Sequence, residues 1–131
     1  MLCIYIAHQD WHPPAKPFDL RERLFIYACL IVRLVHFLHT RGPIAKALSY
    51  QILKSGTSAG ANYEEADDGS SPNDTRAKRR ITLRELKETS FRLRVLREMG
   101  ILTADQDPVI SETRELVKIV AKVISNSERS E

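Results

Sequence analysis

Cysteine is scarce in this chain of 131 residues. Only Cys3 and Cys29 are present, and their spacing forms neither a disulfide framework nor a paired metal-binding knuckle. Long apolar runs are also missing, because the longest, Leu24 to Val32, falls well short of the roughly 20 residues that span a membrane. The apolar first residues lack the basic segment and cleavage site of a secretion signal. We therefore expect a cytoplasmic protein in a reducing compartment, with no membrane partner.

Sequence motifs of catalysis are missing as well. Ser55, Thr57 and Ser58 lie in neither a nucleophile elbow nor a phosphate-binding loop, so we interpret them as packing residues. Glu85 and Glu88 are explained more simply by surface pairing with nearby basic residues than by acid–base chemistry. Two histidine pairs have spacings that a metal could use, although no cysteine or carboxylate completes a site: His36 with His39, and His8 with His12. We expect no enzyme activity, no cofactor and no metal.

Apolar periodicity and capping residues predict four helices and no strand. Asp19 and Ser71 are suitable N-caps, Pro43 suits the first position of a helix, and Gly100 suits the residue after one. The predicted helices cover about residues 19–38, 44–68, 72–99 and 107–124. Short connections favour antiparallel neighbours. We therefore predict an all-α, antiparallel, up-down-up-down four-helix bundle.

The size and composition fit one globular domain with a core of its own, since 43% of the residues are hydrophobic. We assign residues 18–131 to the bundle and residues 1–17 to a leader. Prolines at positions 13, 14 and 17 predict that the leader is an extended or partly ordered arm. Trp11 is the residue expected to dock it on the bundle.

The first helix has apolar residues on two faces. One stripe at helical spacing runs from Leu20 to Leu38, and a second group widens it: Phe25, Cys29, Val32 and His36. We predict that this helix is buried on more than one side. Either it is central in the bundle, or its second face meets another subunit, and His36 is a hydrogen-bonded core or interface residue.

The middle of the second helix is made of small residues. Gly56 and Gly60 each cost an isolated helix about 1 kcal/mol relative to alanine, so tertiary packing must stabilise this segment. Small side chains one turn apart let another backbone approach closely. The residues that we assign to helix packing or to subunit contact are Ser55, Gly56, Ala59, Gly60, Asn62 and Tyr63.

Charge is unevenly distributed, although the formal net charge is only +3. Between residues 76 and 97, nine basic residues stand against two acidic ones, which leaves the rest of the chain net acidic. Arg76, Arg80, Arg84 and Lys87 fall on one ridge of a helix, where they could neutralise phosphates. The candidate nucleic-acid-binding residues are Arg76, Lys78, Arg79, Arg80, Arg84, Lys87 and Arg94.

A solvated face with salt bridges between subunits explains the same basic helix, and this alternative stays open. The second helix ends in carboxylates at positions 64, 65, 67 and 68, where the helix dipole disfavours them. These carboxylates either pair with basic groups elsewhere or are simply solvated. No motif for reading base sequence is present, so any nucleic-acid contact would follow backbone charge and shape.

Three segments together resemble the four-helix-bundle family of 23S rRNA intervening-sequence proteins. They are Phe18-Asp19-Leu20, the segment from Leu53 to Ala66, and Leu83 to Leu96. The resemblance spans roughly residues 18–124 and is most specific in the small-residue segment. It implies a ring-like homopentamer with no catalytic residues. A related branch, the accessory variability determinant proteins of diversity-generating retroelements, associates with a reverse transcriptase and nucleic acid.

Together these observations predict a non-enzymatic oligomeric scaffold or adaptor that binds the backbone of RNA or DNA through its basic third helix. The alternative is a protein–protein module that recruits a nucleic-acid enzyme such as a reverse transcriptase. In that case the basic helix would be consumed by subunit contacts, and the protein would not touch nucleic acid. Salt dependence separates the two, because phosphate binding weakens steeply with ionic strength and an apolar interface does not.

Overall fold

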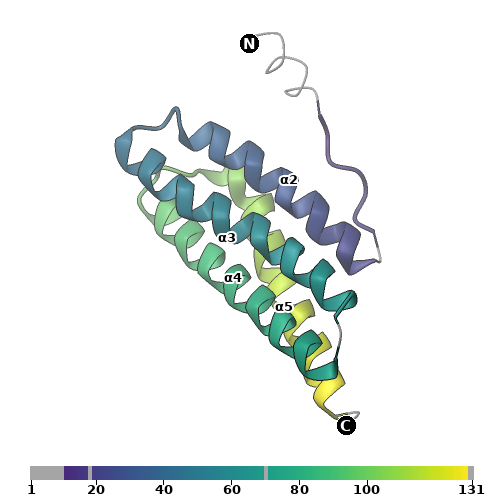
Figure 1. The fold of residues 1–131 in the computed structure, drawn as a ribbon. Helices are drawn as coiled ribbons and strands as arrows, with labels where there is room; N and C mark the ends of the chain where they lie inside the picture. The colour runs from purple at the N-terminus through teal and green to yellow at the C-terminus, as the bar shows by residue number, and fades with distance from the viewer. Residues whose placement is uncertain (1–10, 18, 70, 130–131) are drawn as a thin grey trace.

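The computed structural model describes residues 11–17, 19–69 and 71–129. Within them lie four α-helices and one short 3-10 helix: α2 (Leu20–Leu38), α3 (Pro43–Asp67), α4 (Pro72–Glu98), η1 (Ala104–Gln106) and α5 (Asp107–Arg129). Consecutive helices run antiparallel, with α3 between α2 and α4 (Figure 1). The described residues contain no strand and no helix long and apolar enough to cross a membrane. The predicted all-α fold of four helices is confirmed.

Local capping chemistry sets the helix ends. The side chain of Asp19 accepts a hydrogen bond from the Arg21 backbone N–H at 3.1 Å, and Ser71 accepts one from the Asp74 N–H at 3.1 Å. Gly42 precedes α3 with a φ of 104°, and Gly100 follows α4 with a φ of 75°. Both angles lie in the left-handed region that favours glycine. The helices therefore begin and end close to the predicted positions, except that α5 continues to Arg129, beyond the predicted end near residue 124.

The core joins all four helices through aliphatic side chains and one buried tyrosine. The Tyr27 hydroxyl on α2 lies 2.7 Å from the Thr113 hydroxyl on α5, and Thr113 itself donates to the Val109 carbonyl at 2.8 Å. Because a threonine hydroxyl has one hydrogen, Tyr27 must be the donor to Thr113. The fully buried aliphatic residues around this pair are Leu24, Ile31, Leu38, Ile52, Leu86, Leu93, Leu96, Leu102, Leu116 and Val120.

The glycines of α3 lie against α2. A Cβ atom on Gly56 would lie 2.8 Å from both γ-carbons of Ile31, and one on Gly60 would lie 3.4 Å from the Leu24 Cβ and carbonyl oxygen. At Gly56 the α3 backbone therefore lies against the Ile31 side chain, and at Gly60 it lies near the α2 backbone itself. This close approach explains why small residues occur in the middle of α3 despite their cost in helix propensity.

On its other side, the same part of α3 contacts α4. The Ser55 and Thr89 hydroxyls lie 2.6 Å apart in the core, and the Thr82 hydroxyl donates to the Ala59 carbonyl at 2.9 Å. Asn62 donates to a carbonyl of its own helix and is half-buried, whereas Tyr63 is buried. All these contacts lie within one chain. A contribution of the segment to subunit contacts stays a prediction.

The second face of α2 is exposed. Phe25 is 56% exposed and Val32 is 51% exposed, and His36 is also exposed. The interpretation of α2 as a helix surrounded within its own bundle is therefore wrong, and so is the interpretation of His36 as a core residue. The physical reason is the position of α2 at one edge of the molecule, packed mainly on α3 and much less closely on α5.

Candidate nucleic-acid interface

The first turns of α4 are paired with the acidic end of α3. The Lys78 ammonium lies 2.9 Å from a Glu65 carboxylate oxygen, and Arg79 lies 3.9 Å from Asp67. The Arg79 guanidinium also lies over the Tyr63 ring, 5.7 Å from its centroid. The hydrogen bond to Glu65 raises the pKa of Lys78. Two of the four carboxylates predicted at the end of α3, Glu65 and Asp67, therefore have basic partners within the same chain.

Two more of the predicted binding residues make polar contacts inside the chain. Arg80 forms an ion pair with Glu128 near the end of α5. Arg76 donates a hydrogen bond to the Asn73 side chain at 3.1 Å. Of the seven candidate residues, the four nearest the start of α4 are thus engaged within the fold. Carboxylates of the same chain partly neutralise the positive charge of Lys78, Arg79 and Arg80.

The middle and second half of α4 carry the remaining three candidates. Arg84, Lys87 and Arg94 are exposed, and none forms an ion pair with another described residue. All three lie on the side of the helix opposite its buried stripe. This part of α4 therefore presents cations to solvent, in contrast to its first turns.

Lys87 and Arg94 line a shallow groove between α4 and α5, with a volume of about 270 Å³. Arg114 and Lys118 come from α5, so four cationic side chains border the groove, and no carboxylate does. Within the described residues, none of the four forms an ion pair. The remaining lining residues are Ser90, Phe91 and Val117.

At one end the groove meets a second hollow of about 350 Å³, and the two share Arg94 and Arg114. Here Arg97 binds Asp107 with 2.9 Å between the guanidinium Nε and the carboxylate. This bond lowers the pKa of the Asp107 carboxyl and raises that of Arg97. The ion pair connects the end of α4 to the start of α5 beside the groove.

Sequence reasoning missed the α5 side of this surface. Arg114 and Lys118 are one turn apart on α5 and lie away from the buried residues Leu116 and Val120. The sequence shows that spacing. It does not show the antiparallel register that brings these residues beside α4. Phe91 was also missed, although an aromatic between two basic residues on one helix face is visible in the sequence.

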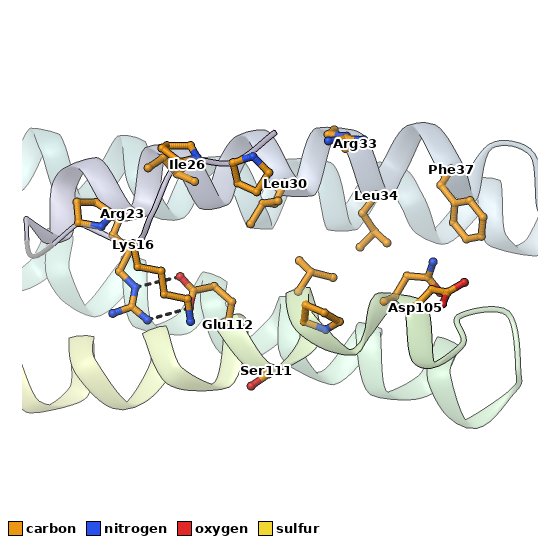
Figure 2. A pocket seen from close by; sticks show the side chains of 16 residues that line it. Lys16, Arg23, Ile26, Leu30, Arg33, Leu34, Phe37, Asp105, Ser111 and Glu112 are labelled. Carbon is orange, nitrogen blue, oxygen red and sulfur yellow. Dashed lines mark hydrogen bonds and ion pairs between the residues drawn. The ribbon is translucent and has the colours of Figure 1, made fainter. Parts of the chain in front are cut away.

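A separate cleft of about 580 Å³ lies between α2 and α5. Its walls include Ile26, Leu30 and Leu34 of α2 and Val109 of α5, and leader residues 13–17 border it (Figure 2). Trp11 docks next to it, since its carbonyl accepts a hydrogen bond from Arg33 and its ring lies 5.7 Å from the same guanidinium. The leader therefore rests on this less closely packed side of the bundle.

One carboxylate holds the cleft and the leader together. Glu112 accepts hydrogen bonds from Arg23 at 2.8 and 3.0 Å and also pairs with Lys16 at 3.2 Å. Its side chain is only 7% exposed. Glu115 lies beside it, and bonds from Arg23 and Lys16 lower the pKa of Glu115. Figure 2 shows Lys16, Arg23 and Glu112 pointing toward one another. Because each carboxylate is paired with cations, we interpret this cluster as structural: it connects the leader, α2 and α5.

The residues considered for acid–base or metal chemistry lie apart. Glu85 accepts a hydrogen bond from Ser58 at 3.2 Å, and Glu88 lies 3.8 Å from Arg92 of its own helix. Among the described residues, no three His, Cys, Asp or Glu side chains gather as a metal site. His8 lies outside the described residues. The arrangement on α4 and α5 suits electrostatic binding of an anion.

Comparison with solved structures identifies an informative likeness. A solved structure from Bacteroides thetaiotaomicron, described as a protein with unknown function from the S23 ribosomal protein family, is 31% identical to this chain with a TM-score of 0.74. The match covers 81% of this chain and 98% of the other. No family model matches, and no curated protein matches. The likeness thus extends over nearly the whole of that structure.

Proposed function

This chain belongs to the 23S rRNA intervening-sequence (S23 ribosomal protein) family, and we propose that it is a non-enzymatic, cytoplasmic, oligomeric scaffold that binds the backbone of RNA or DNA. The observation that supports this proposal is the groove between α4 and α5. Its four cations, Lys87, Arg94, Arg114 and Lys118, face no carboxylate among the lining residues. Phosphates would supply the missing negative charge and release counterions on binding.

The number of cations sets the expected salt dependence. If all four neutralise phosphates of a single strand, affinity falls about 50-fold between 50 and 200 mM salt. Fluorescence anisotropy with labelled 20-nucleotide RNA and DNA measures this slope. An affinity that does not change with salt would contradict the proposal.

The mutational test uses the two lysines of the groove. Lys87→Glu with Lys118→Glu should weaken binding to every nucleic acid by about tenfold or more. A matched control is Lys46→Glu with Lys54→Glu, which makes the same change in net charge at two exposed positions of α3. Reversal at Arg80 is a less clean test, because it would also break the pair with Glu128. Equal loss in both double variants would contradict a local site.

We further propose that the scaffold is a homo-oligomer, a pentamer as the family resemblance implies. The exposed apolar side chains of α2, Phe25 and Val32, support a subunit contact on that face. Light scattering should give a mass of about five chains of 15.0 kDa. Phe25→Glu with Val32→Glu should reduce that mass, and a wild-type monomer would contradict the assembly.

Recruitment of a nucleic-acid enzyme is the second candidate function. The cleft between α2 and α5 favours it, because its walls carry partly buried apolar residues that a partner segment could cover. Binding of a reverse transcriptase at this cleft would persist at 200 mM salt and would survive reversal of Lys87 and Lys118. A partner lost on those reversals would instead be bridged by nucleic acid.

A further inference from the structure

The groove between α4 and α5 contains an aromatic ring that charge neutralisation does not explain. Phe91 is 63% exposed, although a side chain of this size is normally buried. It lines the groove with Lys87 and Arg94, which lie four residues before it and three after it on the same helix. At these separations the three side chains share one face of α4. The ring is therefore bordered by a cation on each side along the helix.

We propose that this groove selects single-stranded nucleic acid, with an unpaired base stacked on Phe91 and the adjoining phosphates held by the four cations. This inference rests on the proposed function and adds the class of strand to it. In a duplex the base faces are covered by their neighbours, so an exposed ring has nothing to stack on. In a single strand the base can turn its face to the ring while the backbone follows the basic side chains.

The dimensions of the groove agree with a short stretch of backbone. Lys87 and Arg94 are separated by seven residues, or about 10 Å along the helix axis. That length corresponds to about three phosphates of a strand that keeps the 3.4 Å axial rise of duplex DNA, and to fewer phosphates of a more extended strand. Arg114 and Lys118 border the opposite side and can contact the same phosphates. Val117 of α5 supplies an apolar neighbour for the stacked base.

The arrangement predicts little dependence on base identity. The lining residues include no Asn, Gln, Asp or Glu that could read the edge of adenine or cytosine, and the Lys and Arg side chains, which could also contact guanine, are assigned here to the phosphates. Every base has an aromatic face, so stacking on Phe91 tolerates all of them. The shared ligand chemistry is a base next to a phosphate, which both RNA and DNA provide.

The experiment compares four probes by fluorescence anisotropy: a 12-nucleotide oligo-U, a 12-nucleotide oligo-dT, an abasic strand of the same length and a 20-base-pair duplex. Phe91→Ala should weaken binding to both single strands by about tenfold, the effect of removing one stacking platform. It should leave the abasic strand and the duplex unchanged, because their contacts are made by the cations. If Phe91→Ala reduces the affinity for oligo-U and for oligo-dT by different factors, the strand with the larger reduction is the one that stacks better on Phe91.

Two further variants separate stacking from simple burial. Phe91→Leu keeps an apolar side chain without a ring and should behave like Phe91→Ala. Phe91→Trp, made with Trp11→Phe so that it is the sole tryptophan, should bind single strands at least as well as wild type, with its fluorescence quenched by oligo-U or oligo-dT but not by the abasic strand. Wild-type affinity in Phe91→Leu, or quenching by the abasic strand, would overturn the proposal.

Failure of this inference differs from failure of the proposed function. If Phe91→Ala binds all four probes like wild type while reversal of Lys87 and Lys118 weakens them all, stacking is wrong and backbone binding stands. If the reversals also have no effect, backbone binding is wrong. A change of oligomeric mass in Phe91→Ala, measured by light scattering, would instead make the ring a subunit contact and would overturn its role as a base platform.

Discussion

Replacing Gly56 by alanine tests the close approach of α2 and α3. On an exposed helix this change would stabilise by about 1 kcal/mol through helix propensity. Here the new Cβ would lie 2.8 Å from two γ-carbons of Ile31 and 3.2 Å from its Cβ. Ile31 is fully buried, and its branched side chain has few rotamers with which to move away. Overpacking of this kind costs about 2 to 3 kcal/mol, so the net loss should be about 1 to 2 kcal/mol.

Gly60→Ala is the matched control in the same helix. Its Cβ would lie 3.4 Å from Leu24, an ordinary contact distance, so the propensity gain should leave this variant as stable as wild type or slightly more stable. Urea unfolding followed by circular dichroism, at one protein concentration, measures both changes as shifts of the midpoint. A Gly56→Ala protein that is as stable as Gly60→Ala would refute the packing argument.

A double-mutant cycle tests whether contact with Ile31 causes the destabilisation expected for Gly56→Ala. Ile31→Ala removes both γ-carbons and should cost about 2 to 5 kcal/mol alone. In the Gly56→Ala background it should cost at least about 1 kcal/mol less, because it also relieves the clash. Additive losses would show that the destabilisation by Gly56→Ala comes from somewhere other than Ile31.

Two further predictions concern polar groups in the bundle. Tyr27→Phe should reduce the free energy of unfolding by about 1 kcal/mol, since Thr113 still donates to Val109. Thr113→Val leaves the Tyr27 hydroxyl buried without an acceptor and should reduce it by about 1 to 3 kcal/mol. A larger loss for Tyr27→Phe in urea unfolding would reverse our assignment of donor and acceptor. The pKa of Glu115 is lowered, chiefly by Arg23, so its contribution to stability is present above the ordinary carboxyl pKa and is lost as pH falls through the lowered value. Glu115→Gln should therefore lower the urea midpoint at pH 7 and reduce its dependence on pH below about 4.5; an unchanged acid dependence would contradict this.

Local chemistry made most of the fold predictable from the sequence. Asp19 and Ser71 form the expected caps, and Gly100, expected to follow a helix, does so with a positive φ. These features depend only on residues within a few positions of each other. The small-residue segment was likewise predicted to pack closely, because Gly56 and Gly60 have no other use inside a helix.

The candidate site was only partly predictable, because it depends on the register between helices. Whether Lys78 is free or paired is decided by its distance from Glu65, thirteen positions earlier on another helix. The same holds for Arg114 and Lys118, which join Lys87 only through the antiparallel packing of α5 on α4. Counting the basic residues of α4 therefore overstated how many cations in its first half are free to bind a ligand. It also left out Arg114 and Lys118 of α5, which form the other wall of the groove.

Because the basic residues at the start of α4 are paired and those of the groove are not, salt should affect the stability of the bundle and its binding of phosphate differently. The paired cations at the start of α4 are partly exposed, and exposed ion pairs contribute about 0 to 1 kcal/mol each, so moderate salt should change the stability of the bundle little. No carboxylate lines the groove, and its four cations form no ion pair with another described residue, so the same salt should weaken phosphate binding steeply. If the protein instead unfolded and released nucleic acid at the same salt concentrations, the paired and unpaired basic residues of α4 would respond to salt together, as a single electrostatic unit. The contrast between Lys78 and Lys87 argues against such a unit, because Lys78 has its countercharge in the fold and Lys87 forms no ion pair with another described residue.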